Sequence, residues 1–212
     1  MTIRAVTWDA VGTLIAVAGT VGSTYAEVAA AHGVTVQAAD LDARFPAAFK
    51  QVLARWPVPY GADDADARAF WDEVVRGTFA IPLPERLPGA CYEVFAEPRS
   101  WRVLPGVREA LALVAARGLP QAVVSNFDVR LPGLLVALGL GPFVTVITSA
   151  GVGAAKPDPA PLRTAARSLG VNVADLLHIG DSPTEDGGLA AYGCRVWLVT
   201  GGIDPQALEQ HL

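Results

Sequence analysis

Short apolar runs that alternate with segments of helical pattern constrain the fold of this chain most strongly. The runs contain few polar residues, which predicts strands that are buried on both faces. One helical segment lies between Pro105 and Gly118 and another between Pro159 and Gly170, as expected for helices that begin at a proline and end before a glycine. Strands that alternate with helices are typical of a parallel, doubly wound sheet, so we predict an α/β fold. The predicted strands are residues 3–8, 121–125, 143–148, 176–180 and 195–200, and a further short helix is predicted over residues 134–138.

Residues 16–97 interrupt this alternation. They contain no strand pattern, but apolar residues recur among them at helical spacing. We predict a helix over residues 41–52 with a kink at Pro46, a second helix capped by Asp66, and a third around Tyr92. The prediction is therefore a core made of residues 1–15 and 98–212, with residues 16–97 inserted as a helical unit.

The composition narrows the possible functions. Hydrophobic residues make up 52% of the 212 residues and charged residues 17%, which excludes a disordered chain. The net charge of −5 offers no basic surface, so we expect no nucleic-acid partner and no membrane partner. Two cysteines without a Cys-x-x-Cys motif indicate neither a disulfide framework nor a zinc site. The N-terminus has no pattern of a secretory signal, and Pro and Gly interrupt the uncharged stretch 131–155, so we expect a cytoplasmic protein.

Polar side chains follow the predicted strands at the edge where a doubly wound sheet binds its ligands. They are Asp9, Ser125, Asn126, Lys156, Asp181 and Asp186. Clustered carboxylates repel one another unless a hard cation such as Mg²⁺ neutralises them. A lysine and a hydroxyl group beside them suit a phosphoryl group or another oxyanion, and a central carboxylate can act as a nucleophile. The pattern predicts a site for a small anionic substrate at this edge.

Four segments resemble the four motifs of the haloacid dehalogenase (HAD) superfamily. They are Trp8-Asp9-Ala10-Val11-Gly12-Thr13-Leu14, Ser125-Asn126, Lys156-Pro157-Asp158-Pro159, and Gly180-Asp181 with Asp186. The resemblance implies a Rossmann-like core, a mobile helical cap formed by residues 16–97, a bound Mg²⁺ ion and a covalent aspartyl intermediate. Its substrate would be a small molecule.

The same resemblance assigns roles to individual residues. It makes Asp9 the nucleophile and Lys156 a catalytic residue that holds the transferred group. It implies Thr13, Ser125 and Asn126 as substrate-binding residues. The implied Mg²⁺ ligands are Asp9, the backbone carbonyl of Val11, and Asp181, with Asp186 as a further ligand or as a partner of the ligands.

Val11 departs from the pattern of the phosphatases in this superfamily. Those enzymes usually carry a second aspartate two residues after the nucleophile, as general acid and base. A valine can donate no proton, and loss of a positioned acid typically costs a factor of about 10² to 10⁴ in rate. We therefore predict a Mg²⁺-dependent phosphatase that is slow on substrates with poor leaving groups. The short spacing between Asp186 and Gly193 also departs from the family pattern and leaves the backbone there undetermined.

Three alternatives remain open. A 2-haloacid dehalogenase-like hydrolase also lacks the second aspartate, although such enzymes typically lack the Gly-Asp pair and use no Mg²⁺. A phosphonate hydrolase would need a cap lysine, and Lys50 is the one cap lysine, on a helix where a solvated charge is the simpler interpretation. A nearly inactive phosphoryl-binding protein is the third. His178 is interpreted as a core histidine, and the sequence leaves the substrate and the oligomeric state undetermined.

Overall fold

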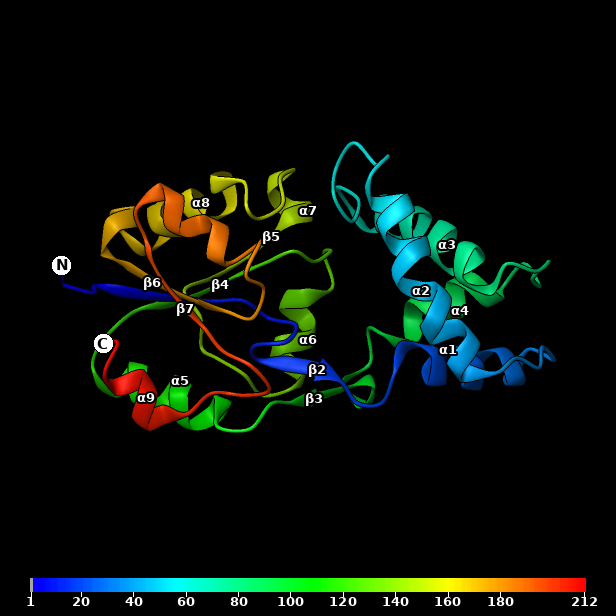
Figure 1. Cartoon of the computed structure of the whole chain (residues 1–212), viewed down its shortest axis with the longest axis horizontal. Helices are drawn as coiled ribbons and strands as arrows, with labels where there is room; N and C mark the ends of the chain where they lie inside the picture. The colour runs from blue at the N-terminus through cyan, green and yellow to red at the C-terminus, as the bar shows by residue number, and fades with distance from the viewer. Residues whose placement is uncertain (1) are drawn as a thin grey trace.

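A parallel sheet forms the centre of the larger lobe in the computed structural model, which describes residues 2–212 (Figure 1). In the described chain its strand order is β5-β4-β1-β6-β7. The strands are β1 (Ala5–Trp8), β4 (Gln121–Ser125), β5 (Thr145–Thr148), β6 (Leu176–Gly180) and β7 (Arg195–Leu198). All neighbouring pairs are parallel, which confirms the predicted sheet. The ends predicted for β4 and β6 match the observed ones, whereas β1 and β5 begin two residues later than predicted.

Helices cover both faces of this sheet (Figure 1). On one face, Val6 and Trp8 of β1 share a core cluster with α5 (Val107–Ala116), α6 (Leu131–Ala137) and α9 (Pro205–Glu209). On the other face, Ala5 packs in a second cluster with α8 (Pro159–Leu169). Neighbouring residues of a strand point to opposite faces, so an entirely apolar strand suits a sheet that is covered twice. The doubly wound arrangement predicted from the apolar runs is thus observed.

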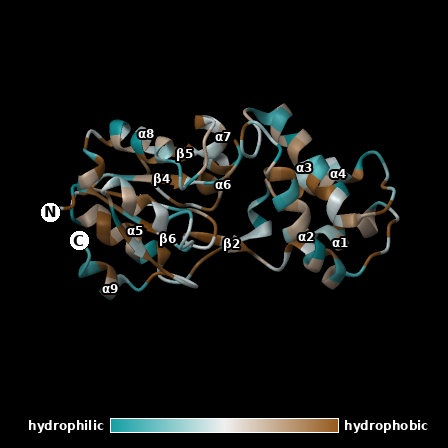
Figure 2. Ribbon diagram, turned by 45° about the horizontal axis from the view of Figure 1, so that its top comes forward, coloured by the Kyte–Doolittle hydropathy of each residue, from teal (hydrophilic) through white to brown (hydrophobic). Residues whose placement is uncertain are grey.

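A second lobe of helices lies to one side of the sheet (Figures 1 and 2). Its elements are α1 (Val21–Ala31), α2 (Ala38–Leu53), α3 (Asp64–Phe79) and α4 (Leu87–Val94), and we call them the cap helices. Helix α2 continues through Pro46, as the apolar spacing predicted. Helix α1 was not predicted, because its small residues give little apolar contrast between its faces. The aromatic residues of α2 and α3 form a cluster of their own, in which Phe49 stacks on Trp71 at 5.8 Å between ring centroids.

Two sequence predictions for this region were wrong. Asp63, not Asp66, caps α3: its side chain accepts the backbone N–H of Asp66 at 2.9 Å, so Asp66 is already inside the first turn. A short antiparallel pair, β2 (Ile15–Val17) and β3 (Trp101–Val103), connects the cap helices to the sheet, although no strand was predicted within residues 16–97. Strands of three residues are too short for a period of two to be recognised in the sequence.

The remaining described elements are a short helix α7 (Ser149–Val152) and three 3₁₀ helices, η1 (Pro98–Ser100), η2 (Val173–Asp175) and η3 (Gly187–Tyr192). Helix η3 fills the short segment between Asp186 and Gly193, and Gly193 ends it at a φ of +94°. The segment whose spacing departed from the family pattern therefore forms two turns of 3₁₀ helix, a longer run than is usual for this type of helix. Across residues 2–212, no helix has both the length and the apolar character needed to cross a bilayer.

Candidate active site

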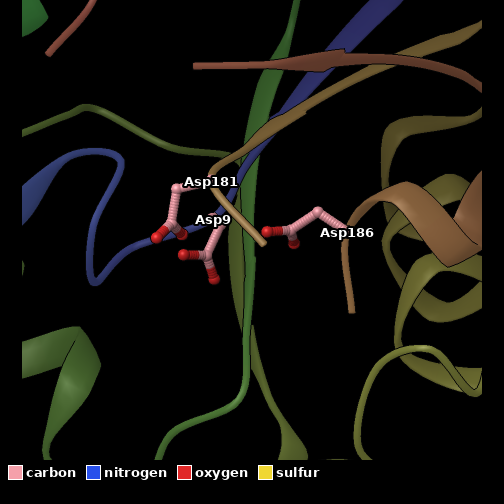
Figure 3. Close-up of side chains that lie close together, drawn as sticks. All are labelled: Asp9, Asp181 and Asp186. Atoms are coloured by element: carbon pink, nitrogen blue, oxygen red, sulfur yellow. The ribbon is translucent and has the colours of Figure 1, made fainter. Parts of the chain in front are cut away.

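Three carboxylates meet at the carboxyl edge of the sheet (Figure 3). Asp9 directly follows β1, and Asp181 directly follows β6. The register of the parallel strands aligns Trp8 with Ile179, so the residues after these strands emerge side by side. Asp186 comes from the turn after β6, and one oxygen from each of the three carboxylates lies within 4.8 Å of the others. The convergence predicted from the strand ends is therefore present in the structure.

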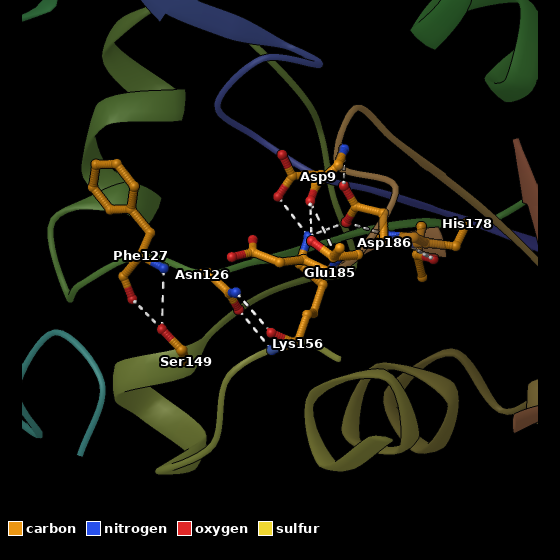
Figure 4. Close-up of polar contacts among 11 residues, drawn as sticks. Asp9, Asn126, Phe127, Ser149, Lys156, His178, Glu185 and Asp186 are labelled. Atoms are coloured by element: carbon orange, nitrogen blue, oxygen red, sulfur yellow. Dashed lines mark hydrogen bonds and ion pairs between the residues drawn. The ribbon is translucent and has the colours of Figure 1, made fainter. Parts of the chain in front are cut away.

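Lys156 is buried among these carboxylates (Figure 4). Its Nζ donates a hydrogen bond to Asp9 Oδ1 at 2.6 Å and another to Asp186 Oδ1. Burial alone lowers the pKa of Lys156, but the two carboxylates outweigh burial and hold its pKa above the ordinary value. The lysine therefore carries its positive charge at neutral pH, beside the nucleophile that the family resemblance implies.

Asn126 fixes the loop that carries this lysine. The Asn126 side chain accepts the backbone N–H of Lys156 at 2.7 Å and donates to the Lys156 carbonyl at 3.0 Å. This pair of bonds joins the end of β4 to the loop before α8. Asn126 was predicted to bind substrate; the contacts in the structure give its side chain a positioning role, which no spacing in the sequence could indicate.

His178 supports Asp186 from inside the sheet. Its Nε2 lies 2.9 Å from Asp186 Oδ1, and its Nδ1 lies 2.9 Å from Thr7 Oγ1. A carboxylate can only accept, so the Nε2 carries the hydrogen and Nδ1 accepts from the threonine hydroxyl. Burial, the largest effect, lowers the pKa of His178 and keeps the ring neutral. His178 is a core histidine, as predicted, and it also positions Asp186, a role that was missed.

Two glycines allow the carboxylates to approach the backbone. A Cβ on Gly12, whose φ is +92°, would lie 2.2 Å from Asp181 Oδ2. A Cβ on Gly180 would lie 2.1 Å from the Asp186 carboxyl carbon. Both distances are far inside van der Waals contact, so each glycine provides the space that one carboxylate occupies.

The other two predicted substrate-binding residues are buried. Thr13 is fully buried, and its Oγ1 has no hydrogen-bond partner, the single such side-chain atom found in residues 2–212. Ser125 is buried at the end of β4. A buried hydroxyl without a partner costs free energy, which a bound oxyanion would recover. Val11 keeps 37% of its surface exposed. Lys50 is also exposed, near the end of α2.

Glu185 is a residue of the site that was not predicted from the sequence. It lies beside Lys156 and Asn126 (Figure 4). Burial raises its pKa, and Asp9 and Asp186 raise it further through repulsion, although Lys156 opposes them. Its position immediately before Asp186 in the sequence could have identified it as a candidate site residue.

The charges of the site fit a divalent cation. Four carboxylates, of Asp9, Asp181, Glu185 and Asp186, face one charged lysine and a neutral histidine. Partial burial raises the pKa of Asp181, and the neighbouring Asp9 and Asp186 raise it further. That repulsion is what a bound cation removes, and oxygen ligands of this kind suit Mg²⁺.

Comparisons with known proteins agree with this geometry. A sequence model of the haloacid dehalogenase-like hydrolases matches residues 3–193. Haloacid dehalogenase-like hydrolase domain-containing protein 3 of Mus musculus is 38% identical over 212 residues, which cover 94% of this chain and 82% of the mouse protein. A phosphoglycolate phosphatase of Rhodospirillum rubrum is 35% identical over 156 residues, 71% of this chain and 60% of that protein.

Solved structures share the fold. L-2-haloacid dehalogenase from Xanthobacter autotrophicus superposes with a TM-score of 0.73 at 22% identity, over 99% of this chain and 82% of that one. The match to the family extends over nearly the whole sequence and includes all four motifs that meet around Asp9. This protein therefore belongs to the haloacid dehalogenase-like hydrolases.

Proposed function

We propose that this chain is a Mg²⁺-dependent phosphatase that acts on a small phosphorylated metabolite, with Asp9 as the nucleophile. The observation that carries the proposal is the excess of carboxylates around Lys156. Their mutual repulsion supports a bound cation beside Asp181, in addition to the charged lysine. A dehalogenase-like reaction offers no reason for a second carboxylate there. The R. rubrum relative, a phosphoglycolate phosphatase by name, supports the same reaction class.

The residues that would hold Mg²⁺ are Asp9, Asp181 and the backbone carbonyl of Val11, with Asp186 as a ligand or as a partner of the ligands. A Mg²⁺ ion bound there would neutralise charge on the transferred phosphoryl group. Asp186 also holds the ammonium group of Lys156, so it links the cation site to the lysine.

In the first step, a carboxylate oxygen of Asp9 forms a bond to phosphorus, and the bond from phosphorus to the leaving oxygen breaks. Lys156, the unpartnered hydroxyl of Thr13 and the Ser125 hydroxyl bind the phosphoryl oxygens. The leaving group departs as an anion, because Val11 can give it no proton. In the second step, water attacks phosphorus, the bond from phosphorus to the Asp9 oxygen breaks, and inorganic phosphate leaves while the proton lost by the water passes to solvent or to the phosphate.

This chemistry favours substrates that need no acid. Acyl and aryl phosphates release stable anions, whereas alkyl phosphates release a strongly basic alkoxide. The missing acid then lowers the rate for alkyl phosphates by a factor of about 10² to 10⁴ relative to an enzyme that has one. The proposed role of the cap helices, residues 16–97, is to close over the strand ends and exclude water during the first step.

A dehalogenase-like reaction is the second candidate, and Val11 is the observation that favours it. A halide leaves without a proton, so an aspartate at position 11 would be superfluous. Attack by Asp9 on carbon would then require no Mg²⁺.

The decisive experiment is to trap the intermediate. Wild-type protein is incubated with acetyl phosphate, with and without Mg²⁺, and separately with beryllium fluoride and Mg²⁺. We expect Mg²⁺-dependent release of phosphate and a fluoroberyllate adduct on Asp9, seen by ¹⁹F NMR and absent in Asp9→Asn. Release of halide from 2-chloropropionate without Mg²⁺ would instead support the dehalogenase. A protein that forms the adduct without turning over would be a phosphoryl-binding protein.

A further inference from the structure

An apolar cavity lies beside the candidate nucleophile, between the cap helices and the carboxyl edge of the sheet. Its volume is about 210 Å³. Val11 and Asn126 line it on the side of the active site, and Phe49, Tyr60 and Trp71 line it on the side of the cap. Because Val11 is two residues from Asp9, a group in this cavity would be the part of the substrate that the reaction releases.

The size and the lining indicate what the cavity accepts. A cavity of roughly 150 Å³ lined by apolar side chains is large enough to bind benzene. A volume of about 210 Å³ therefore accommodates one aromatic ring with a small substituent, or a branched aliphatic chain of similar size. The surrounding rings are close to one another, with Phe49 and Tyr60 centroids 5.6 Å apart, so the walls favour an edge or face contact with a flat ligand.

Charge is the second selective property. Among the residues described around the cavity, Arg130 is the one cation. Its Nε donates to Asp128 Oδ1 at 2.9 Å and its Nη2 donates to Asp128 Oδ2 at 2.6 Å. Asp128 is completely buried. The positive charge is therefore neutralised by a buried carboxylate and is not free for an anionic group of the substrate.

Further contacts engage the guanidinium group of Arg130. Its Nη1 donates to the Tyr92 carbonyl at 2.6 Å, and its guanidinium group lies 3.8 Å from the centre of the Tyr92 ring. Asp128 in turn accepts the indole N–H of Trp71 at 2.8 Å. The pair thus joins the loop after β4 to two cap helices and forms a neutral wall of the cavity.

We propose that this cavity selects substrates whose leaving group bears, beyond the group bonded to phosphorus, an uncharged apolar body of about one ring, and that the Asp128–Arg130 pair rejects leaving groups that carry a further carboxylate there. This inference rests on the proposed phosphatase function and narrows its substrate class. It predicts poor activity on phosphoglycolate, even though a relative is named for that substrate.

The test uses acyl phosphates, whose leaving groups need no proton, so Val11 does not slow the first step, which kcat/KM reports. Wild-type kcat/KM is measured for acetyl, benzoyl and 4-carboxybenzoyl phosphate in the presence of Mg²⁺. We expect benzoyl phosphate to exceed acetyl phosphate by at least about tenfold, since buried apolar contact favours the ring. We expect 4-carboxybenzoyl phosphate to fall below benzoyl phosphate by a similar factor. Equal values for the three substrates, or a preference for the carboxylate, would overturn the inference.

Two variants locate the effect in the cavity. Asp128→Asn keeps the shape but releases the charge of Arg130, so the ratio of 4-carboxybenzoyl to benzoyl phosphate should rise about tenfold. The matched control is Asp72→Asn, which removes an exposed partner of Arg76 on the same helix as Trp71. Val17→Phe fills the cavity and should lower the ratio of benzoyl to acetyl phosphate, whereas Val136→Phe, an exposed position away from it, should not. If Asp128→Asn does not fold, as judged by circular dichroism, the Val17→Phe ratio decides; an unchanged ratio there refutes the inference.

A binding measurement separates failure of the phosphatase proposal from failure of the cavity proposal. If wild-type protein hydrolyses none of the acyl phosphates, calorimetry with benzyl alcohol and with 4-(hydroxymethyl)benzoate tests the cavity alone. Binding of benzyl alcohol that is weakened by Val17→Phe, together with weaker binding of 4-(hydroxymethyl)benzoate, supports the cavity even without hydrolysis. Equal binding of both probes, or binding of neither, overturns it.

Discussion

Replacing Val11 with aspartate introduces the second carboxyl group that the family resemblance implies, as acid and base, for phosphatases. The side chain at position 11 borders both the cavity and the loop that follows Asp9, so a carboxyl group there lies on the side where the leaving group departs. The backbone carbonyl of residue 11 is unchanged by the substitution. We expect Val11→Asp to raise the turnover of alkyl phosphates more than that of aryl phosphates.

The structure sets the size of this effect. General acid catalysis is worth a factor of about 10² to 10⁴, or about 3 to 5 kcal/mol in activation free energy. Val11 is 37% exposed, so an aspartate there stays partly hydrated, although repulsion from the neighbouring carboxylates destabilises the fold to some extent. The nearby carboxylates of Asp9 and Asp181 would raise its pKa by repulsion, which helps it to carry a proton. We expect a gain near the lower limit, about 10²-fold, because no other residue has been selected to orient the new group.

The assay compares kcat/KM for benzyl phosphate and for p-nitrophenyl phosphate in the wild type and in the variant. Both substrates carry a ring that fits the cavity, and they differ in the basicity of the leaving oxygen. Val11→Asn is the matched control, because its side chain has nearly the same shape and cannot donate a carboxyl proton. The ratio of benzyl to p-nitrophenyl phosphate should rise in Val11→Asp and stay unchanged in Val11→Asn.

The reasoning is refuted if the folded Val11→Asp protein keeps the wild-type ratio. A rise of equal size in Val11→Asn would also refute it, since polarity at position 11 would then explain the gain. Wild-type turnover of benzyl phosphate as fast as that of p-nitrophenyl phosphate would mean that another group already supplies the proton.

Three further predictions concern metal binding, packing and pH. Asp181→Asn should weaken Mg²⁺ binding at least about tenfold in calorimetry and lower phosphatase activity with it; unchanged affinity would remove Asp181 from the metal site. Gly180→Ala should displace the Asp186 carboxylate and abolish most activity. The control is Gly133→Ala in α6, where a Cβ meets nothing within 4 Å; it should keep its activity and stabilise the fold by about 0.5–1 kcal/mol. Equal activity in both variants would contradict the role given to Gly180. The pKa of His178 is lower in the folded protein than its unfolded value of about 6.5, so below that pH the unfolded chain binds a proton that the folded chain does not. The free energy of unfolding should therefore decrease as pH falls below about 6.5, by up to 1.36 kcal/mol per pH unit. Urea unfolding of His178→Gln should lack that decrease, and an identical pH dependence in both proteins would exclude His178 as its cause.

The sheet and the strand-end residues could be predicted because they follow from periodicity. Uniformly apolar runs require a sheet covered on both faces, and parallel strands bring their carboxyl ends to one edge. Asp9 and Asp181 are brought to that edge in this way, since each directly follows a strand. Contacts that depend on loop conformation were not accessible in this way. The bond from Asn126 to the Lys156 backbone and the bond from His178 to Asp186 join residues whose separation in sequence carries no period.

The cap elements show a similar division. The apolar stripe of α2 was recognisable, whereas α1, whose faces differ little in hydropathy, was missed. The Asp128–Arg130 pair was missed because two charged residues in a loop look like a solvated turn in the sequence. The carboxylate of Asp128 is buried because the fold brings a cap helix against it, and the sequence does not show that contact.

The antiparallel pair of β2 and β3 makes the cap an exchangeable module. The chain leaves the core through β2 and returns through β3, and the register places Val17 opposite Trp101, so the two crossing points are adjacent. A two-residue Asn-Gly turn joining Val17 to Trp101 would close these strands into a hairpin and delete the intervening helices without stretching the backbone. The same junction would accept a cap of another size or shape. The core can therefore keep its reaction while the inserted segment changes, which gives such a scaffold access to new substrates by replacement of one continuous stretch of sequence.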